Sequence, residues 1–166
     1  MKKIFFIVAI CATAFVQQSF AQPVPVQRED TSTQSTFSPL LDSYYDIKDA
    51  LVAGKANTAS IQASEFVKAA KSVDSKDFSA DTRDALVKDA GAIAATKNIT
   101  QQREHFASFS TNMAALAKVI KLSAEPIYEA YCPMKKSYWL SSDKAIKNPY
   151  YGNAMLTCGK VTETIQ

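Results

Sequence analysis

One apolar pattern in the middle of the chain constrains the fold more than any other feature. Apolar side chains recur there at spacings of three and four positions, at Phe106, Phe109, Met113, Leu116 and Ile120. These spacings place all of them on one face of an α-helix, and such a face is normally buried. The pattern therefore predicts a helix that packs against other parts of the chain.

Three further helical patterns precede this one, over roughly residues 39–53, 58–73 and 80–97. Cap residues mark three of the four expected helix starts, and they are Ser38 before Pro39, Ser79 and Asn98. Gly54 is expected to end the first helix. Because the connections are short, neighbouring helices should run antiparallel. The sequence thus predicts a mainly α-helical protein with an up-down four-helix bundle.

Residues 125–166 have a different pattern. Prolines interrupt a helical pattern there, and the segment is rich in tyrosine and contains the only tryptophan. Residues 127–132 and 137–140 alternate in the way that strands do, and turn residues follow them. We therefore expect a compact C-terminal cap that is partly β, rich in aromatic residues and packed on the bundle.

Residues 1–21 have the pattern of a secretory signal peptide. Lys2 and Lys3 precede an apolar run that is too short to span a bilayer, and small residues precede a cleavage point after Ala21. Cys11 lies too early in the apolar run for a lipid anchor. The pattern predicts a periplasmic or secreted protein that does not insert into the membrane after cleavage.

The mature chain has few features of an enzyme or of a nucleic-acid-binding protein. Residues 22–36 are polar and predict a disordered linker, which leaves residues 37–166 as one domain. Two of the 19 basic residues belong to the signal peptide, and the others nearly balance the 16 acidic ones, so no basic excess would attract nucleic acid. His105 is the only histidine, and no phosphate-binding glycine loop occurs. We expect no enzymatic activity, and the sequence does not indicate an oligomeric state.

Two pairs of sulfur-containing residues lie in the predicted cap: Cys132 with Met134, and Met155 with Cys158. Thiolate and thioether are soft ligands that select Cu(I), and the indole of Trp139 could lie against the bound cation. In an exported protein, however, two cysteines commonly form a disulfide. The methionines would then be packing residues. The residues alone favour a Cys132–Cys158 disulfide and leave the metal site open.

Several motifs of the chain resemble one protein family. They are QREHFASFS at 102–110, YCPM at 131–134, YWLS at 138–141, NPYYGNAM at 148–155 and CGKV at 158–161. They resemble a bacterial envelope family known as domain of unknown function 3347, over roughly residues 40–165. The resemblance implies a helical exported domain. Similar domains also occur fused to periplasmic adaptor subunits of heavy-metal efflux pumps of the copper/silver type.

The resemblance raises the metal hypothesis to the first prediction. We expect an exported, non-enzymatic domain that binds Cu(I) or Ag(I) and acts with heavy-metal efflux components. Its expected ligands are Cys132, Met134, Met155 and Cys158, with Trp139 as a shield beside them. The alternative is a protein-interaction module without metal, which has a structural Cys132–Cys158 disulfide. In that alternative the partner meets exposed aromatic side chains, namely Tyr138, Tyr150 and Tyr151.

Overall fold

The computed structural model describes residues 34–74, 76 and 79–166. It contains four helices, which are α1 (Gln34–Val52), α2 (Ala56–Ser72), α3 (Ala80–Ala94) and α4 (Ile99–Val119). The predicted signal peptide, Cys11 and most of the predicted linker lie outside the described residues. The last three linker residues, 34–36, are helical. Within the described ranges, no helix is long and apolar enough to cross a membrane.

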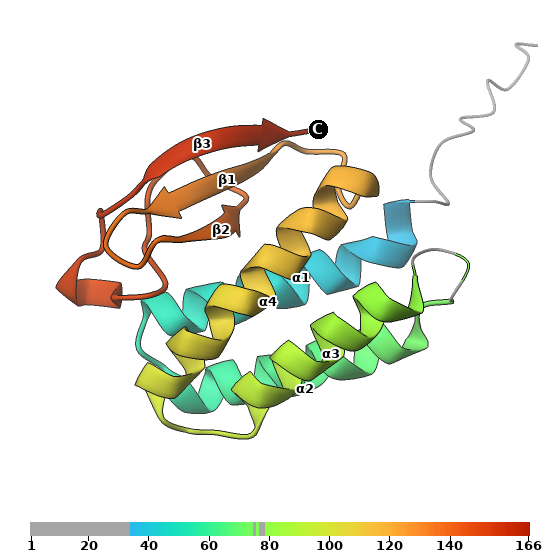
Figure 1. The fold of residues 1–166 in the computed structure, drawn as a ribbon, viewed down its shortest axis with the longest axis horizontal. Coiled ribbons are helices and arrows are strands. Elements are labelled where there is room, and N and C mark those ends of the chain that lie inside the picture. The colour runs from blue at the N-terminus through green and yellow to red at the C-terminus, as the bar shows by residue number, and fades with distance from the viewer. Residues whose placement is uncertain (1–33, 75, 77–78) are drawn as a thin grey trace, which may run out of the picture.

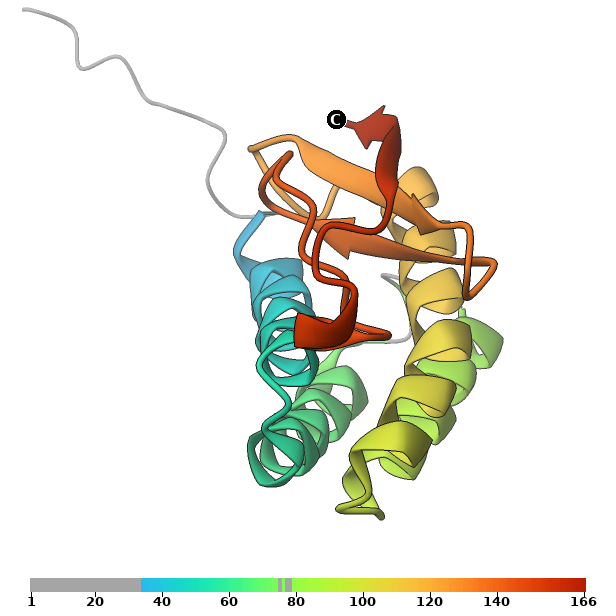
Figure 2. The ribbon, with the colours of Figure 1, turned by 90° about the vertical axis from the view of Figure 1, so that its left-hand side faces the viewer.

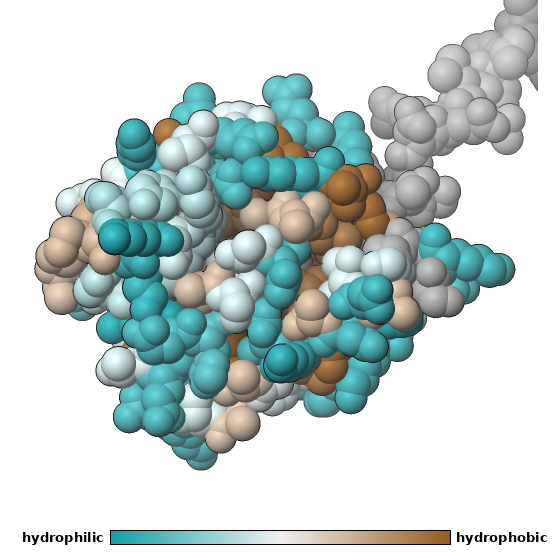
Figure 3. Space-filling view, viewed as in Figure 1, coloured by the Kyte–Doolittle hydropathy of each residue, from teal (hydrophilic) through white to brown (hydrophobic). Residues whose placement is uncertain are grey.

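The helices pack through the apolar faces that the sequence predicts. Each helix packs against the next one along the chain (Figure 1). Phe106 and Phe109 of α4 are fully buried, and their rings contact those of Tyr44 from α1 and Phe66 from α2 at centroid distances of 4.7–5.4 Å. Hydrophilic side chains cover most of the face seen in Figure 3. The prediction of a mainly helical domain is therefore confirmed.

Most of the predicted helix ends are confirmed, but the start of α1 is not. Asn98 caps α4 by accepting the amide N–H groups of Thr100 and Gln101, and Ser79 caps α3. Ser38 is not a cap, because α1 begins at Gln34 and contains Pro39. The helix extends upstream because Phe37 is buried and lies one turn from the buried Leu41.

A three-stranded antiparallel sheet forms most of the C-terminal cap. Its strands are β1 (Ile127–Cys132), β2 (Ser137–Ser141) and β3 (Lys160–Ile165), in the order β2-β1-β3. The sequence predicts the first two strands, but β3 and the short 3-10 helix η1 (Gly152–Ala154) are additional findings. Figures 1 and 2 show the sheet against α1 and α4, on the side away from α2 and α3.

Polar contacts as well as aromatic packing attach the cap to the helices. The hydroxyl of the buried Tyr44 in α1 accepts the amide N–H of Leu140 in β2 at 2.9 Å. Lys118 of α4 pairs with Glu129 of β1 at 3.0 Å and with Glu163 of β3 at 2.8 Å. These two carboxylates raise the pKa of Lys118. The sheet is therefore held in a defined position on the bundle.

Candidate functional site

Cys132 is the last residue of β1, and the tight turn that follows it directs an N–H group at its sulfur. The amide of Lys135 donates to Cys132 Sγ at 3.4 Å, and the amide of Lys136 donates to the Cys132 carbonyl at 2.8 Å. Lys136 has a positive φ of 55°, which lets the chain reverse into β2. The thiol itself is buried. The turn thus fixes Cys132 at the end of the sheet.

Cys158 approaches Cys132 from the segment that precedes β3. Its side chain is half-buried, and its amide donates to the carbonyl of Met155 at 3.1 Å. Partial burial raises the pKa of the Cys158 thiol, and so does the neighbouring Cys132, whose side chain is a hydrogen-bond partner. The amide N–H of Met134 also donates to this thiol and opposes the rise. The two thiols are therefore direct neighbours, as both the metal and the disulfide hypotheses require.

Asn148 holds the two cysteine-bearing segments together. Its side-chain N–H₂ group donates to Cys132 Sγ at 3.1 Å and to the Cys158 carbonyl at 2.7 Å. Its side-chain oxygen accepts the amide N–H of Tyr150 at 2.9 Å, and the residue is fully buried. Sequence reasoning identifies Asn148 only as a turn residue. Asn148 stands between the polar segment 141–147 and the aromatic pair Tyr150 and Tyr151. This position is the sequence signal that could have indicated a buried asparagine that bridges two segments.

Both cysteines are free thiols in the structure. The Cys132–Cys158 disulfide therefore stays a prediction for oxidising conditions. Within the described parts of the chain, no group of three or more His, Cys, Asp or Glu side chains could hold a metal ion. Any further protein ligand for a metal at this dithiol would thus be of another type, and the methionine thioethers of the first prediction are of such a type.

The two methionines are attached to the dithiol through their backbones and have exposed side chains. Met134 donates its amide N–H to the Cys158 thiol, and Met155 accepts from the Cys158 amide. Their side chains are 60% and 37% exposed, respectively. Cys132, in contrast, is fully buried. The four predicted ligand residues therefore range from a buried thiol through a half-buried thiol to exposed methionine side chains.

Trp139 lies in β2 and packs against the segment that contains Cys158 and Gly159. A Cβ atom on Gly159 would come within 2.6 Å of Trp139 Cη2, and the indole also contacts the Tyr150 ring edge-on at 6.1 Å. Trp139 is almost fully buried. Trp139 therefore packs against the residue that directly follows Cys158.

The aromatic surface that the alternative hypothesis needs is smaller than expected. Tyr138 is 41% exposed, but Tyr150 is buried and donates its hydroxyl to the Tyr138 carbonyl. Tyr151 is half-buried. Tyr150 is therefore a core residue, because its ring fills the space between Trp139 and the Phe106 ring of α4.

A family model matches residues 40–125, which is just over half of the chain. The matched range contains α2, α3, α4 and the part of α1 from residue 40 onward, and it ends before β1. Both cysteines therefore lie outside it, although the motif resemblance extends to residue 165. No curated protein and no solved structure gives a significant match. The chain belongs to the family described as "Protein of unknown function (DUF3347)".

Proposed function

We propose that the Cys132–Cys158 dithiol binds one soft monovalent metal ion, Cu(I) or Ag(I). The observation that supports this most is the pairing of two free thiols from separate segments, joined by hydrogen bonds and by the Asn148 side chain. Two thiolates would supply the anionic ligands, and soft thiolates prefer Cu(I) to harder ions. The domain itself performs no catalysis in this proposal.

The hydrogen bonds around the sulfurs suit a thiolate ligand pair. Cys132 Sγ accepts N–H groups from Lys135 and Asn148, and the Cys158 thiol accepts the amide N–H of Met134. Donors of this kind stabilise the negative charge of a thiolate. They also fix the orientation of a ligand before the metal arrives. The reduced protein would therefore present its two thiols with little rearrangement.

The exposed methionines would complete the site from the solvent side. A thioether adds no charge, so Met134 and Met155 would leave the complex of one Cu(I) and two thiolates with a single negative charge. Their exposure places flexible, soft donors where an incoming ion first meets the protein. Trp139 would form the buried wall of the site behind Gly159.

We also infer the setting in which this site works. The predicted signal peptide would deliver the domain to the periplasm or the exterior, where it would serve metal handling or heavy-metal efflux components. An up-down arrangement of the helices is supported by the short connections at residues 53–55 and 95–98 and by the packing of each helix on the next. Such a bundle would act as a rigid base for the cap.

Competition against a chromophoric Cu(I) chelator tests the proposal. Anaerobic, fully reduced protein should bind about one Cu(I), and Cys132→Ser or Cys158→Ser should abolish this binding. The double variant Met134→Leu with Met155→Leu should weaken it at least tenfold, which is about 1.4 kcal/mol. Leucine keeps the side-chain volume, so the fold should persist.

Met113→Leu is the matched control, because Met113 lies buried on α4 within the bundle core. It should bind Cu(I) as the parent does. If the parent takes up no Cu(I), the metal proposal is wrong. If the double methionine variant competes as well as the parent, the methionines are not ligands. A reduced protein without Cu(I) affinity would favour the alternative, in which an oxidised Cys132–Cys158 pair is structural and Tyr138 meets a protein partner.

A further inference from the structure

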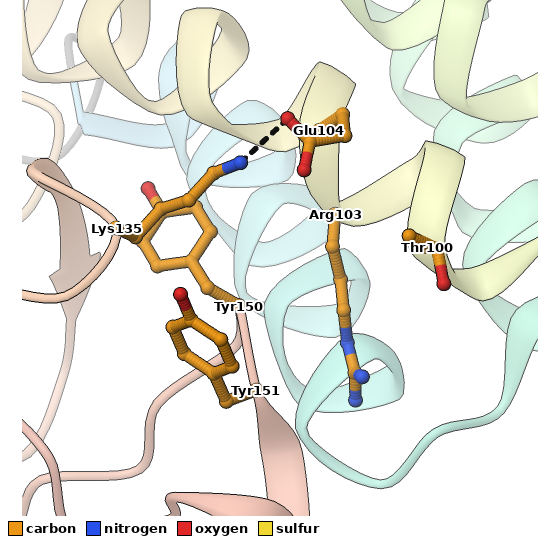
Figure 4. Close-up of a pocket in the computed structure, with 6 residues that line it drawn as sticks. All are labelled: Thr100, Arg103, Glu104, Lys135, Tyr150 and Tyr151. Atoms are coloured by element: carbon orange, nitrogen blue, oxygen red, sulfur yellow. Dashed lines mark hydrogen bonds and ion pairs between the residues drawn. The ribbon is translucent and has the colours of Figure 1, made fainter.

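A small cavity of about 210 Å³ lies between the first turns of α4 and two loops of the cap (Figure 4). Its lining contains charged, hydroxyl and aromatic side chains, from Thr100, Arg103, Glu104, Lys135, Tyr150 and Tyr151. Arg103 and Tyr151 lie across from each other in Figure 4, and Lys135 reaches toward Glu104. The volume suits a molecule of a few heavy atoms, since typical drug-sized ligands occupy larger pockets.

Arg103 has hydrogen-bonding capacity that the protein does not use. Its Nη2 atom donates to the Leu51 carbonyl at 2.7 Å, but its Nε atom is buried without a partner. Within the described residues, Arg103 takes part in no ion pair. Burial lowers the pKa of its guanidinium, although the residue as a whole is only half-buried. A buried N–H donor without a partner, such as this Nε–H group, is costly and calls for an explanation.

The other charges of the cavity leave this arginine uncompensated. Lys135 and Glu104 form an ion pair at 2.5 Å, in which the lysine side chain is only 20% exposed. Two cations and one carboxylate give the cavity a surplus of one positive charge. A monoanion would neutralise this surplus. A dianion would add repulsion from Glu104.

We propose that this cavity binds a small monocarboxylate. A guanidinium offers a planar pair of N–H groups that matches the two oxygens of a carboxylate. Thr100 and Tyr151 line the same cavity and carry hydroxyl groups as further hydrogen-bonding groups. This site goes beyond the proposed metal function, because it concerns a different ligand and does not involve the sulfur atoms.

The cavity is formed by Arg103, whose guanidinium is held in place by the loop at Gly152, and by the loops that carry Met134 and Met155. Gly152 has a positive φ of 55°, and a Cβ atom there would overlap Arg103 Nη2 and lie 2.8 Å from the Val52 carbonyl. The absence of a side chain at residue 152 therefore lets the loop close over the guanidinium. Lys135 directly follows Met134, and Tyr151 belongs to the loop that leads to Met155.

A titration of the metal-free, reduced protein with sodium acetate tests the proposal by NMR. Sodium chloride at equal ionic strength is the reference, and inorganic phosphate is the comparison anion. Acetate should cause saturable shifts of the Arg103 Nε–H signal and of the Lys135 and Tyr151 amides. Phosphate should bind at least fivefold more weakly. Linear shifts that chloride reproduces would overturn the proposal, and tighter phosphate binding would overturn the monocarboxylate assignment.

Variants locate the binding. Arg103→Gln should weaken acetate binding at least tenfold, whereas Arg83→Gln should not change it. Arg83 is a matched control because it also donates to a main-chain carbonyl, that of Val73, but lies on α3 and does not line the cavity. If Arg103→Gln does not fold, Lys135→Gln is the test variant. It removes the surplus positive charge of the cavity and should also weaken acetate binding. Unchanged affinity in the folded Arg103 or Lys135 variant contradicts the site. No metal is present, so failure of the Cu(I) proposal leaves this result unaffected.

Discussion

Trp139 and Gly159 are packed so closely that only glycine fits beside the indole. A Cβ atom at residue 159 would lie 2.6 Å from Trp139 Cη2 and 3.0 Å from the Tyr131 carbonyl. The backbone of Gly159 also has a φ of +151°, which L side chains rarely adopt. Because Gly159 directly follows Cys158, this contact fixes where the second cysteine meets the first. The Cys-Gly pair and the tryptophan thus form one structural unit.

We predict that Gly159→Ala destabilises the domain by about 2–4 kcal/mol, through backbone strain together with overlap against Trp139. Chemical denaturation measures the loss. Gly54→Ala is the control for a positive φ without overlap, because Gly54 has a φ of 68° but nothing lies near its Cβ position. That control should lose only about 1 kcal/mol. If the two variants lose the same free energy of unfolding, the Trp139 indole moves aside at little cost and does not position Cys158.

Tyr44→Phe is expected to destabilise the domain by about 1–3 kcal/mol, because it leaves a buried N–H group without an acceptor. The Tyr44 hydroxyl accepts the Leu140 amide and contacts Ser110, and so it joins α1, α4 and β2. Thermal or urea unfolding measures the effect. Tyr45→Phe, at the next and only half-buried position, is the control and should change stability by less than about 0.5 kcal/mol. Equal effects of both substitutions would mean that the Leu140 contact contributes little.

The opposite sign is expected for Gly91→Ala on α3. Gly91 lies inside the helix, and its Cβ position is open space. Alanine restricts the unfolded chain and has the higher helix propensity, so the free energy of unfolding should rise by about 0.5–1 kcal/mol. Urea denaturation checks this. A loss of stability would indicate that α3 packs more tightly around residue 91 than the structure shows.

The helices were predictable because their signals are local. Four of the five predicted stripe positions of α4 are buried as their spacing requires, namely Phe106, Phe109, Met113 and Leu116, and Asn98 begins that helix as a cap should. The fifth, Ile120, directly follows the helix and is half-buried. Pro39 misled the prediction of α1, because burial of Phe37 outweighs the usual preference for proline in the first turn. Tertiary burial, which spacing alone does not reveal, decided that boundary.

The candidate site was predictable only in part. Both the metal hypothesis and the disulfide hypothesis predict that the side chains of Cys132 and Cys158 lie close together, and in the structure they do. Strand β3 was missed because its side chains are mostly exposed and lack an apolar alternation. The Asn148 bridge was missed because it depends on contacts across 10 and 16 positions that form only when the loop folds back on the sheet. Long-range polar contacts of this kind leave no periodic signal.

The last prediction concerns the pH dependence of Cu(I) binding, and it rests on the proposed dithiol site. Partial burial and the neighbouring Cys132 raise the pKa of the Cys158 thiol above its ordinary value, so this thiol is protonated near neutral pH. A metal ion must displace that proton, and the apparent affinity should therefore rise with pH by about tenfold per unit for each proton displaced, between about pH 6 and pH 8. Chelator competition at several pH values, corrected for the titration of the chelator, measures this slope. Methionine thioethers do not titrate, so the variant with Met134→Leu and Met155→Leu should bind more weakly but keep the same slope. An affinity that does not change with pH would mean that the Cys158 thiolate is not a ligand, whatever the contribution of the methionines.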